Sequence, residues 1–151
     1  MDGKLLLLQA EALLENERNL IPNLANLSAL IWERMDRLNW AGFYLIKGGE
    51  LLLGPFQGKP ACIHIPLGKG VCGTAAVQKE TVIVPDVHEF PGHIACDSAS
   101  RSEIVIPLLD DKNEVLGVLD IDSPFPARFT EEDAKILEQL ARLAVSGCDW
   151  E

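Results

Sequence analysis

Hydrophobic residues recur every three or four positions in two segments of the first forty residues, which is the spacing of one face of a helix. Residues 4–15 form a short amphipathic segment, and a clearer stripe follows at Leu24, Leu27, Ile31, Met35 and Leu38. Pro22 fits the first turn of this second helix, where its missing N–H is not needed. The pattern therefore predicts two helices before residue 39.

A further helix is predicted near the C-terminus. Thr130 precedes three consecutive acidic residues, which resembles a capping box and places negative charge at the positive end of the helix dipole. The apolar positions that follow predict the buried face of this helix: Ile136, Leu137, Leu140, Leu143 and Ala144. Another helix is predicted over the alanine-rich residues 71–78.

Short apolar runs bounded by glycine and proline occupy the middle of the chain and predict strands. These runs are residues 39–46, 51–53, 62–66, 81–84, 103–109 and 115–120. Tight turns link the first pair and the last pair, so most neighbouring strands form hairpins. Strands of this kind, with helices at both chain ends, predict an α+β fold in which helices flank an antiparallel sheet.

Residues 86–101 show no periodicity and contain Pro91 and Gly92, which predicts a long irregular loop. Loops of this length are uncommon and tend to be functional or mobile. This loop contains Cys96 and two of the three histidines of the chain, His88 and His93.

The length of 151 residues and the hydrophobic content of 48% fit a single domain over residues 1–151. No apolar run approaches the ~20 residues of a membrane-spanning helix, and the N-terminal residues lack a secretory cleavage site. A formal net charge of −10 disfavours nucleic acids and anionic membranes as partners. The expected location is the cytoplasm.

Four cysteines without a secretion signal do not predict a disulfide framework. Each is a buried core residue, a metal ligand or a redox-active thiol. Cys72 lies at the start of the predicted helix 71–78, where the dipole favours a thiolate, so local physics slightly prefers it as the low-pKa thiol. Cys96 lies in the loop, three positions after His93, and Cys62 lies beside a predicted strand. Cys148 carries no recognisable signal.

A metal site is the main competing interpretation of the cysteines. No Cys-x-x-Cys or His-x-x-x-His pair fixes two ligands on one local structure, so no metal site is predicted. The histidines of the loop are expected to form hydrogen bonds. The ligand candidates considered are Cys62, His64, Cys72, His88, His93 and Cys96.

Asp120 and Asp122 lie two residues apart, so both point to the same face of an extended strand. Glu103, at the start of the neighbouring strand, could join them. Such a cluster suits an ammonium group or the protonation of an oxygen, although a solvated strand end is the alternative. Trp40 and Tyr44 also share a strand face and form either a pocket wall or ordinary core packing.

Five segments together resemble the free methionine-R-sulfoxide reductase family, whose members are small enzymes built from one GAF domain. The resemblance extends from about residue 24 to 144, and ordinary GAF sensor domains lack three cysteines at this spacing. It implies a six-stranded antiparallel sheet with helices on both faces. The segments are residues 39–45, 54–59, 70–75, 92–97 and 117–123.

The resemblance implies reduction of the R epimer of free L-methionine sulfoxide to L-methionine, with thioredoxin as reductant and no metal or flavin cofactor. It makes Cys96 the catalytic cysteine and Cys62 and Cys72 the resolving cysteines, which overrules the helix-dipole preference for Cys72. The carboxylates that it implies for substrate binding or protonation are Glu103, Asp120 and Asp122, and the aromatic wall is Trp40 and Tyr44.

Several alternatives stay open at this point. The dominant resolving cysteine, the carboxylate that donates the proton, closure of the 86–101 loop and a possible homodimer are not determined by sequence. A noncatalytic GAF module that binds a small ligand or senses oxidants is the competing function. A sensor normally needs an attached output domain, so a lone chain of 151 residues favours the reductase.

Overall fold

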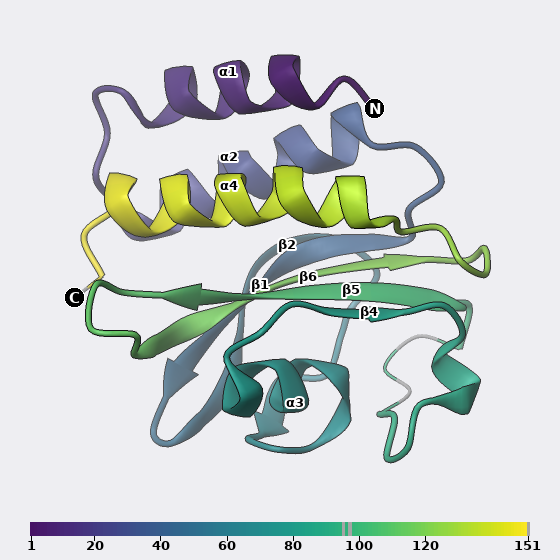
Figure 1. Ribbon diagram of the computed structural model, residues 1–151. Coiled ribbons are helices and arrows are strands. Elements are labelled where there is room, and N and C mark those ends of the chain that lie inside the picture. Colours follow the sequence, from purple (N-terminus) through teal and green to yellow (C-terminus); the bar gives the residue numbers. More distant parts are fainter. Residues whose placement is uncertain (95, 97, 151) are drawn as a thin grey trace.

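The computed structural model describes residues 1–94, 96 and 98–150. Its helices and strands follow one another in an order close to the predicted one (Figure 1). They are α1 (Gly3–Leu14), α2 (Leu20–Arg34), β1 (Trp40–Lys47), β2 (Glu50–Gly58), β3 (His64–Pro66), α3 (Gly70–Gln78), β4 (Val82–Val84), the short 3₁₀ helix η1 (Val87–Glu89), β5 (Ser102–Leu109), β6 (Val115–Ser123) and α4 (Glu131–Gly147).

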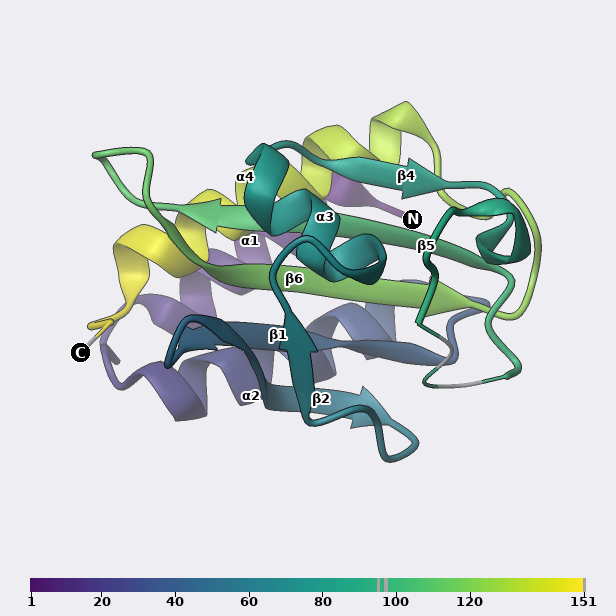
Figure 2. The same cartoon turned by 90° about the horizontal axis from the view of Figure 1, so that it is seen from below.

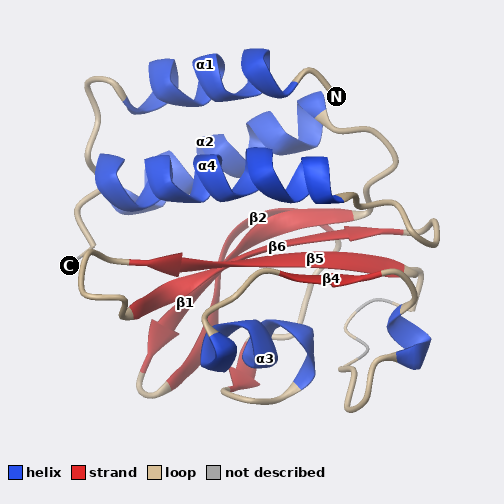
Figure 3. Ribbon diagram, in the orientation of Figure 1, coloured by secondary structure: helices blue, strands red, loops and turns tan. Residues whose placement is uncertain are grey.

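The strands form one six-stranded antiparallel sheet in the order β3-β2-β1-β6-β5-β4. Helices α2 and α4 cover one face of the sheet, and α1 lies on top of these two helices (Figure 1). Helix α3 lies over β5 and β6 on the opposite face (Figures 2 and 3). The predicted α+β architecture, with helices on both faces of the sheet, is confirmed.

Two apolar cores lie on the two faces of the sheet. The larger core joins the sheet to the helices α1, α2 and α4. The smaller core lies under α3 and includes Tyr44, Cys72, Val105 and Val118. Because β5 and β6 are buried on both faces, polar side chains on these strands lie inside the protein rather than in water.

The second predicted helix ends earlier than its apolar stripe suggests. It stops at Arg34, and Met35 and Leu38 lie in the connection that follows. Met35 adopts an extended backbone conformation and Arg37 has a φ of 58°, so the chain turns towards β1 at this point. Met35 is nevertheless buried in the larger core. The stripe therefore predicted burial correctly and helical extent wrongly.

Smaller differences concern the other segments. The predicted strand 62–66 forms only over β3, so Cys62 lies in the preceding connection. The predicted loop 86–101 includes η1, which the Asp86 side chain caps by accepting from the His88 N–H. The predicted capping box at Thr130 is present. Ile136 and Leu143 are half-buried rather than buried, because they lie at the edges of the apolar stripe of α4.

No helix in the described ranges combines the length and apolar character needed to cross a bilayer.

Gly42 allows β1 and β2 to approach closely beneath α3. A β-bulge shifts the register of the two strands between Gly42 and Tyr44. A Cβ on Gly42 would lie 2.3 Å from the Cβ of Phe56, which no folded structure tolerates without movement. The absence of a side chain here leaves room for the Phe56 ring to stack on Trp40.

We expect Gly42→Ala to lower the free energy of unfolding by about 1–3 kcal/mol, because the added methyl overpacks this contact. Gly54→Ala on β2 is the matched control, since its nearest neighbour would be the Phe43 carbonyl oxygen at 3.0 Å. Urea unfolding of both variants measures the difference. An equal decrease in the free energy of unfolding in both variants would contradict the idea that the contact with Phe56 makes Gly42 necessary.

Candidate active site

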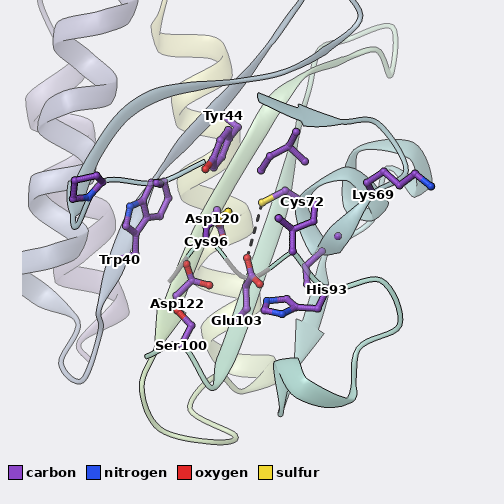
Figure 4. Close-up of a pocket in the computed structure, with 16 residues that line it drawn as sticks. Trp40, Tyr44, Lys69, Cys72, His93, Cys96, Ser100, Glu103, Asp120 and Asp122 are labelled. Carbon is purple, nitrogen blue, oxygen red and sulfur yellow. Dashed lines mark hydrogen bonds between the residues drawn. The ribbon is translucent and has the colours of Figure 1, made fainter. Parts of the chain in front are cut away.

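The register of three adjacent strands gathers acidic and aromatic side chains under α3. Asp122 on β6 lies opposite Trp40 on β1 and opposite Glu103 on β5. Residues paired directly across antiparallel strands point to the same face. Asp120, two residues before Asp122, shares that face. The sheet therefore brings together the three carboxylates that sequence comparison could only suggest, as Figure 4 shows.

A pocket opens between this sheet face, α3 and the loop that carries Cys96 (Figure 4). Seven of the eight predicted site residues line it, and the eighth, Cys62, is bonded to one of them. Its lining consists of Trp40, Tyr44, Pro60, Ala61, Ile65, Lys69, Gly70, Val71, Cys72, His93, Ile94, Cys96, Ser100, Glu103, Asp120 and Asp122.

A disulfide joins Cys62 to Cys96, with their Cα atoms 5.5 Å apart. Cys62 lies in the connection before β3 and Cys96 lies in the loop between η1 and β5. The bond therefore links two residues that are 34 positions apart in the sequence. Cys72 is a free, buried thiol in α3. Cys148 is also free and buried, but it belongs to the larger core on the other face of the sheet.

Burial decides the ionisation of Cys72. Its side chain is 4% exposed, and its Sγ donates to Oε2 of Glu103 over 4.0 Å. Burial, and after it the negative charges of Asp120 and Glu103, raise the pKa of this thiol well above its ordinary value. The predicted low-pKa thiol at the start of α3 is therefore wrong. Desolvation outweighs the partial charge of a short helix dipole.

The acidic cluster holds protons that exposed carboxyl groups would lose. Burial, followed by the charges of Asp120 and Asp122, raises the pKa of Glu103 well above its ordinary value. Burial also raises the pKa of Asp120, against the opposing effect of hydrogen bonds with Glu103 and Cys72. Glu103 and Asp120 are each only 6% exposed. Such closely spaced carboxyl groups share protons, and Glu103 is the group best suited to donate one.

Asp120 also offers an unused acceptor. Its Oδ1 is buried and has no hydrogen-bond partner among the residues that the structure describes. A buried carboxylate oxygen without a partner is costly, and a cationic donor that entered the pocket would satisfy it. The site is thus suited to an ammonium group.

The two predicted aromatic residues, Trp40 and Tyr44, line the pocket, and a third ring, Phe56, stacks on Trp40 without lining the pocket. Trp40 stacks on Tyr44 with ring centroids 5.8 Å apart and on Phe56 at 5.1 Å. Sequence reasoning did not anticipate the stack of Phe56 on Trp40, which depends on the pairing of Phe56 with Gly42 across β1 and β2. The wall and core interpretations of Trp40 and Tyr44 are both correct, since these side chains line the pocket and belong to the smaller core.

Three residues of the loop that were not among the predicted site residues also line the pocket: His93, Ile94 and Ser100. His93 is half-buried, and burial followed by the charge of His88 lowers its pKa. Ser100 is buried, and its Oγ accepts a hydrogen bond from the Asn39 side chain at 3.0 Å. Their nearness in sequence to Cys96 was the one available signal. Ala95 and Asp97, which flank Cys96, lie outside the described residues.

One group of potential metal ligands occurs in the described part of the chain. Ligand atoms of Cys72, Glu103 and Asp120 lie within 4.8 Å of one another. Cys72 alone among the six sequence candidates belongs to this group. The same three groups form the acidic, thiol-containing side of the pocket.

Comparison with known proteins identifies the family. A family model of the GAF domain matches residues 9–146. The free methionine-R-sulfoxide reductase of Escherichia coli is 56% identical over 129 residues, covering 85% of this chain and 78% of the relative. The chain belongs to the free methionine-R-sulfoxide reductase family. The resemblance of the sequence to this family is thereby confirmed.

Two further members of the free methionine-R-sulfoxide reductase family support this assignment. The enzyme of that name from Saccharomyces cerevisiae is 50% identical over 150 residues, covering 95% of this chain and 83% of the relative. The X-ray structure of the enzyme from Neisseria meningitidis in complex with its substrate superimposes with a TM-score of 0.93 at 45% identity. That superposition covers 96% of this chain and 87% of the neisserial one.

The raised pKa of Glu103 predicts a dependence of stability on pH. Above its ordinary value of 4.5, the unfolded state releases this proton while the folded state retains it. The free energy of unfolding therefore falls as pH rises towards the folded pKa. We expect wild type to lose stability relative to Glu103→Gln as pH rises from 4.5 towards the raised pKa of the folded state.

Urea unfolding of both proteins across this range measures the effect. Glu114→Gln, which changes an exposed carboxyl group in the turn between β5 and β6, is the control. If the free energy of unfolding changes with pH in the same way in wild type and Glu103→Gln, Glu103 ionises at the same pH in the folded and unfolded states, which would contradict the expectation.

Proposed function

We propose that this protein reduces free L-methionine (R)-S-oxide to L-methionine with a cysteine thiolate, and that thioredoxin regenerates the thiols. Membership of the reductase family supports the reaction. The observation that carries the proposal is a redox-capable pair, Cys62 and Cys96, beside a pocket that contains a buried acidic cluster and an aromatic wall. A noncatalytic ligand-binding domain has no need for all three features in one place.

The pocket chemistry matches the parts of the proposed substrate. The α-ammonium group pairs with the acidic cluster, in which Asp120 Oδ1 lacks a partner. The S-methyl group packs against Trp40 and Tyr44. A methionine sulfoxide within a peptide has no α-ammonium group, so burying these carboxylates against it would leave them uncompensated. This requirement explains a preference for the free amino acid.

The first chemical step is attack of the Cys96 thiolate on the sulfoxide sulfur. Glu103 protonates the sulfoxide oxygen, since its raised pKa lets it keep a proton at pH values where an exposed carboxyl group has lost one. The oxygen is transferred to Cys96, which becomes a sulfenic acid, and methionine leaves as the reduced sulfide. Cys96 is thus oxidised and the substrate sulfur reduced by two electrons.

The second step removes the sulfenic acid. The Cys62 thiolate attacks the Cys96 sulfur, the S–O bond breaks, water leaves and the Cys62–Cys96 disulfide forms. Cys62 is favoured over Cys72 for this role because it is the cysteine bonded to Cys96, while Cys72 is buried with a raised pKa. The dithiol of thioredoxin then reduces the disulfide and becomes oxidised itself.

Turnover of free methionine-R-sulfoxide, followed by NADPH oxidation through thioredoxin and its reductase, tests the proposal. We expect Cys96→Ser to reduce this rate by about a thousandfold or more, because it removes the nucleophile. Cys148→Ser is the matched control, since it changes a buried cysteine of the other core and should retain wild-type turnover. Wild-type rates in Cys96→Ser would refute the assignment of the nucleophile. Absence of turnover in wild type would refute the proposed activity and favour a noncatalytic domain that binds a ligand or senses oxidants.

The two remaining pocket cysteines should behave differently. We expect Cys62→Ser to release up to one methionine per chain in a single burst and then to recycle at least about tenfold more slowly, because the sulfenic acid has lost its partner. Cys72→Ser should recycle faster than Cys62→Ser, since it retains the Cys62–Cys96 pair. Rapid-quench measurement of methionine separates burst from recycling. A missing burst in Cys62→Ser would place that thiol in the first step instead.

A further inference from the structure

The connection between β2 and β3, residues 59–63, carries Cys62 and has no regular secondary structure. Lys59, Pro60 and Ile63 are exposed. A short exposed segment of this kind samples several conformations unless other groups hold it. Its conformation matters because it sets the distance between the thiol of Cys62 and that of Cys96.

Two side chains of the pocket wall bind the backbone of this connection from the inside. The Tyr44 hydroxyl donates a hydrogen bond to the carbonyl oxygen of Cys62 at 2.8 Å. The indole N–H of Trp40 donates to the carbonyl oxygen of Lys59 at 3.2 Å. Both donors lie on β1, a central strand, and their rings stack on each other. A third bond comes from the backbone of β2, where the Leu53 N–H donates to the carbonyl oxygen of Ile63 at 2.8 Å. The connection is therefore attached to the sheet at three points, and Tyr44 supplies the bond made to Cys62 itself.

Tyr44 is the more important of the two side-chain anchors, because its bond is made to the cysteine itself. Its side chain is 2% exposed. Burial and the neighbouring charges of Asp120, Cys72, Asp122 and Glu103 raise the pKa of its hydroxyl, so it remains a donor throughout the working range of the protein.

We propose that Tyr44 is a positioning residue for disulfide formation: its hydroxyl holds the backbone of Cys62 where the Cys62 thiol reaches Cys96. The description of Cys62 as the resolving thiol rests on the proposed function, but the tether itself does not. The hydrogen bond of Tyr44 is made to the backbone of Cys62 and not to a sulfur atom. It raises the effective concentration of one thiol at the other by restricting the chain that carries Cys62.

The reaction that the tether assists is balanced within the chain. The Cys62 thiolate forms the S–S bond, the S–O bond of the Cys96 sulfenic acid breaks, and the oxygen leaves as water. A separate reaction, thiol–disulfide exchange with an external dithiol, reduces this bond and frees both thiols while the external dithiol becomes a disulfide. A tether present in both states disfavours the reduced form, since the separated thiols gain less conformational freedom.

A redox titration without substrate tests the tether. Purified protein is equilibrated in glutathione buffers of graded potential, and the Cys62–Cys96 disulfide is quantified by alkylation and mass spectrometry. We expect Tyr44→Phe, which keeps the ring and removes the hydroxyl, to lower the equilibrium constant for disulfide formation about fivefold. For a two-electron couple this is about 20 mV towards a more oxidising potential.

Ser28→Ala is the matched control. Ser28 on α2 is fully buried, and its hydroxyl donates to the carbonyl oxygens of Leu24 at 2.8 Å and Pro55 at 3.2 Å. This variant also loses a buried hydroxyl bonded to backbone, but on the other face of the sheet, so its disulfide equilibrium should match wild type. Trp40→Phe, which removes the donor to Lys59, should shift the equilibrium in the same direction as Tyr44→Phe and serves if Tyr44→Phe does not fold.

A second measurement follows the resolving step itself. After one equivalent of methionine-R-sulfoxide, trapping with dimedone should label more Cys96 sulfenic acid in Tyr44→Phe than in wild type. An unchanged equilibrium constant in folded Tyr44→Phe, or an equal shift in Ser28→Ala, would overturn the tether. If the disulfide equilibrium shifts in Tyr44→Phe but not in Ser28→Ala, and wild type releases no methionine, the tether is supported and the proposed reductase activity is refuted.

Discussion

The burial of carboxyl groups in the middle of the sheet is the constraint on which the rest of the pocket depends. Glu103 and Asp120 lie on strands that are covered on both faces, so water does not stabilise their charges. Such groups stay protonated, share protons or receive a cation. Each of these outcomes is chemically useful for a substrate that carries both an ammonium group and an oxygen to be protonated.

The same burial separates the roles of the three pocket cysteines. Cys72 lies against the acidic cluster, so its thiol is disfavoured as an anion and instead donates towards Glu103. Cys62 and Cys96 lie in irregular connections and bond to each other, and Cys96 also lines the pocket. Cys96 and the three carboxyl groups line the same pocket, whereas Cys72 is the cysteine whose thiol contacts Glu103.

The aromatic wall connects these two parts of the site. Trp40 and Tyr44 present their rings to the pocket and their polar tips to the connection that carries Cys62. Tyr and Trp are suited to this double use, because each combines a large apolar surface with one hydrogen-bond donor. Gly42 also contributes to this arrangement, because the absence of a side chain there leaves space for Phe56, which stacks on Trp40.

Sequence alone determined the order of helices and strands, because periodicity and capping residues such as Thr130 are local signals. Together with the family resemblance, it also identified Cys62, Cys72, Cys96 and the acidic cluster. Only the tertiary structure decided that Cys62 rather than Cys72 pairs with Cys96, that burial overrides the dipole at Cys72, and that Phe56 stacks on Trp40. These properties depend on desolvation and strand register, which arise from residues far apart in the chain and leave no local pattern.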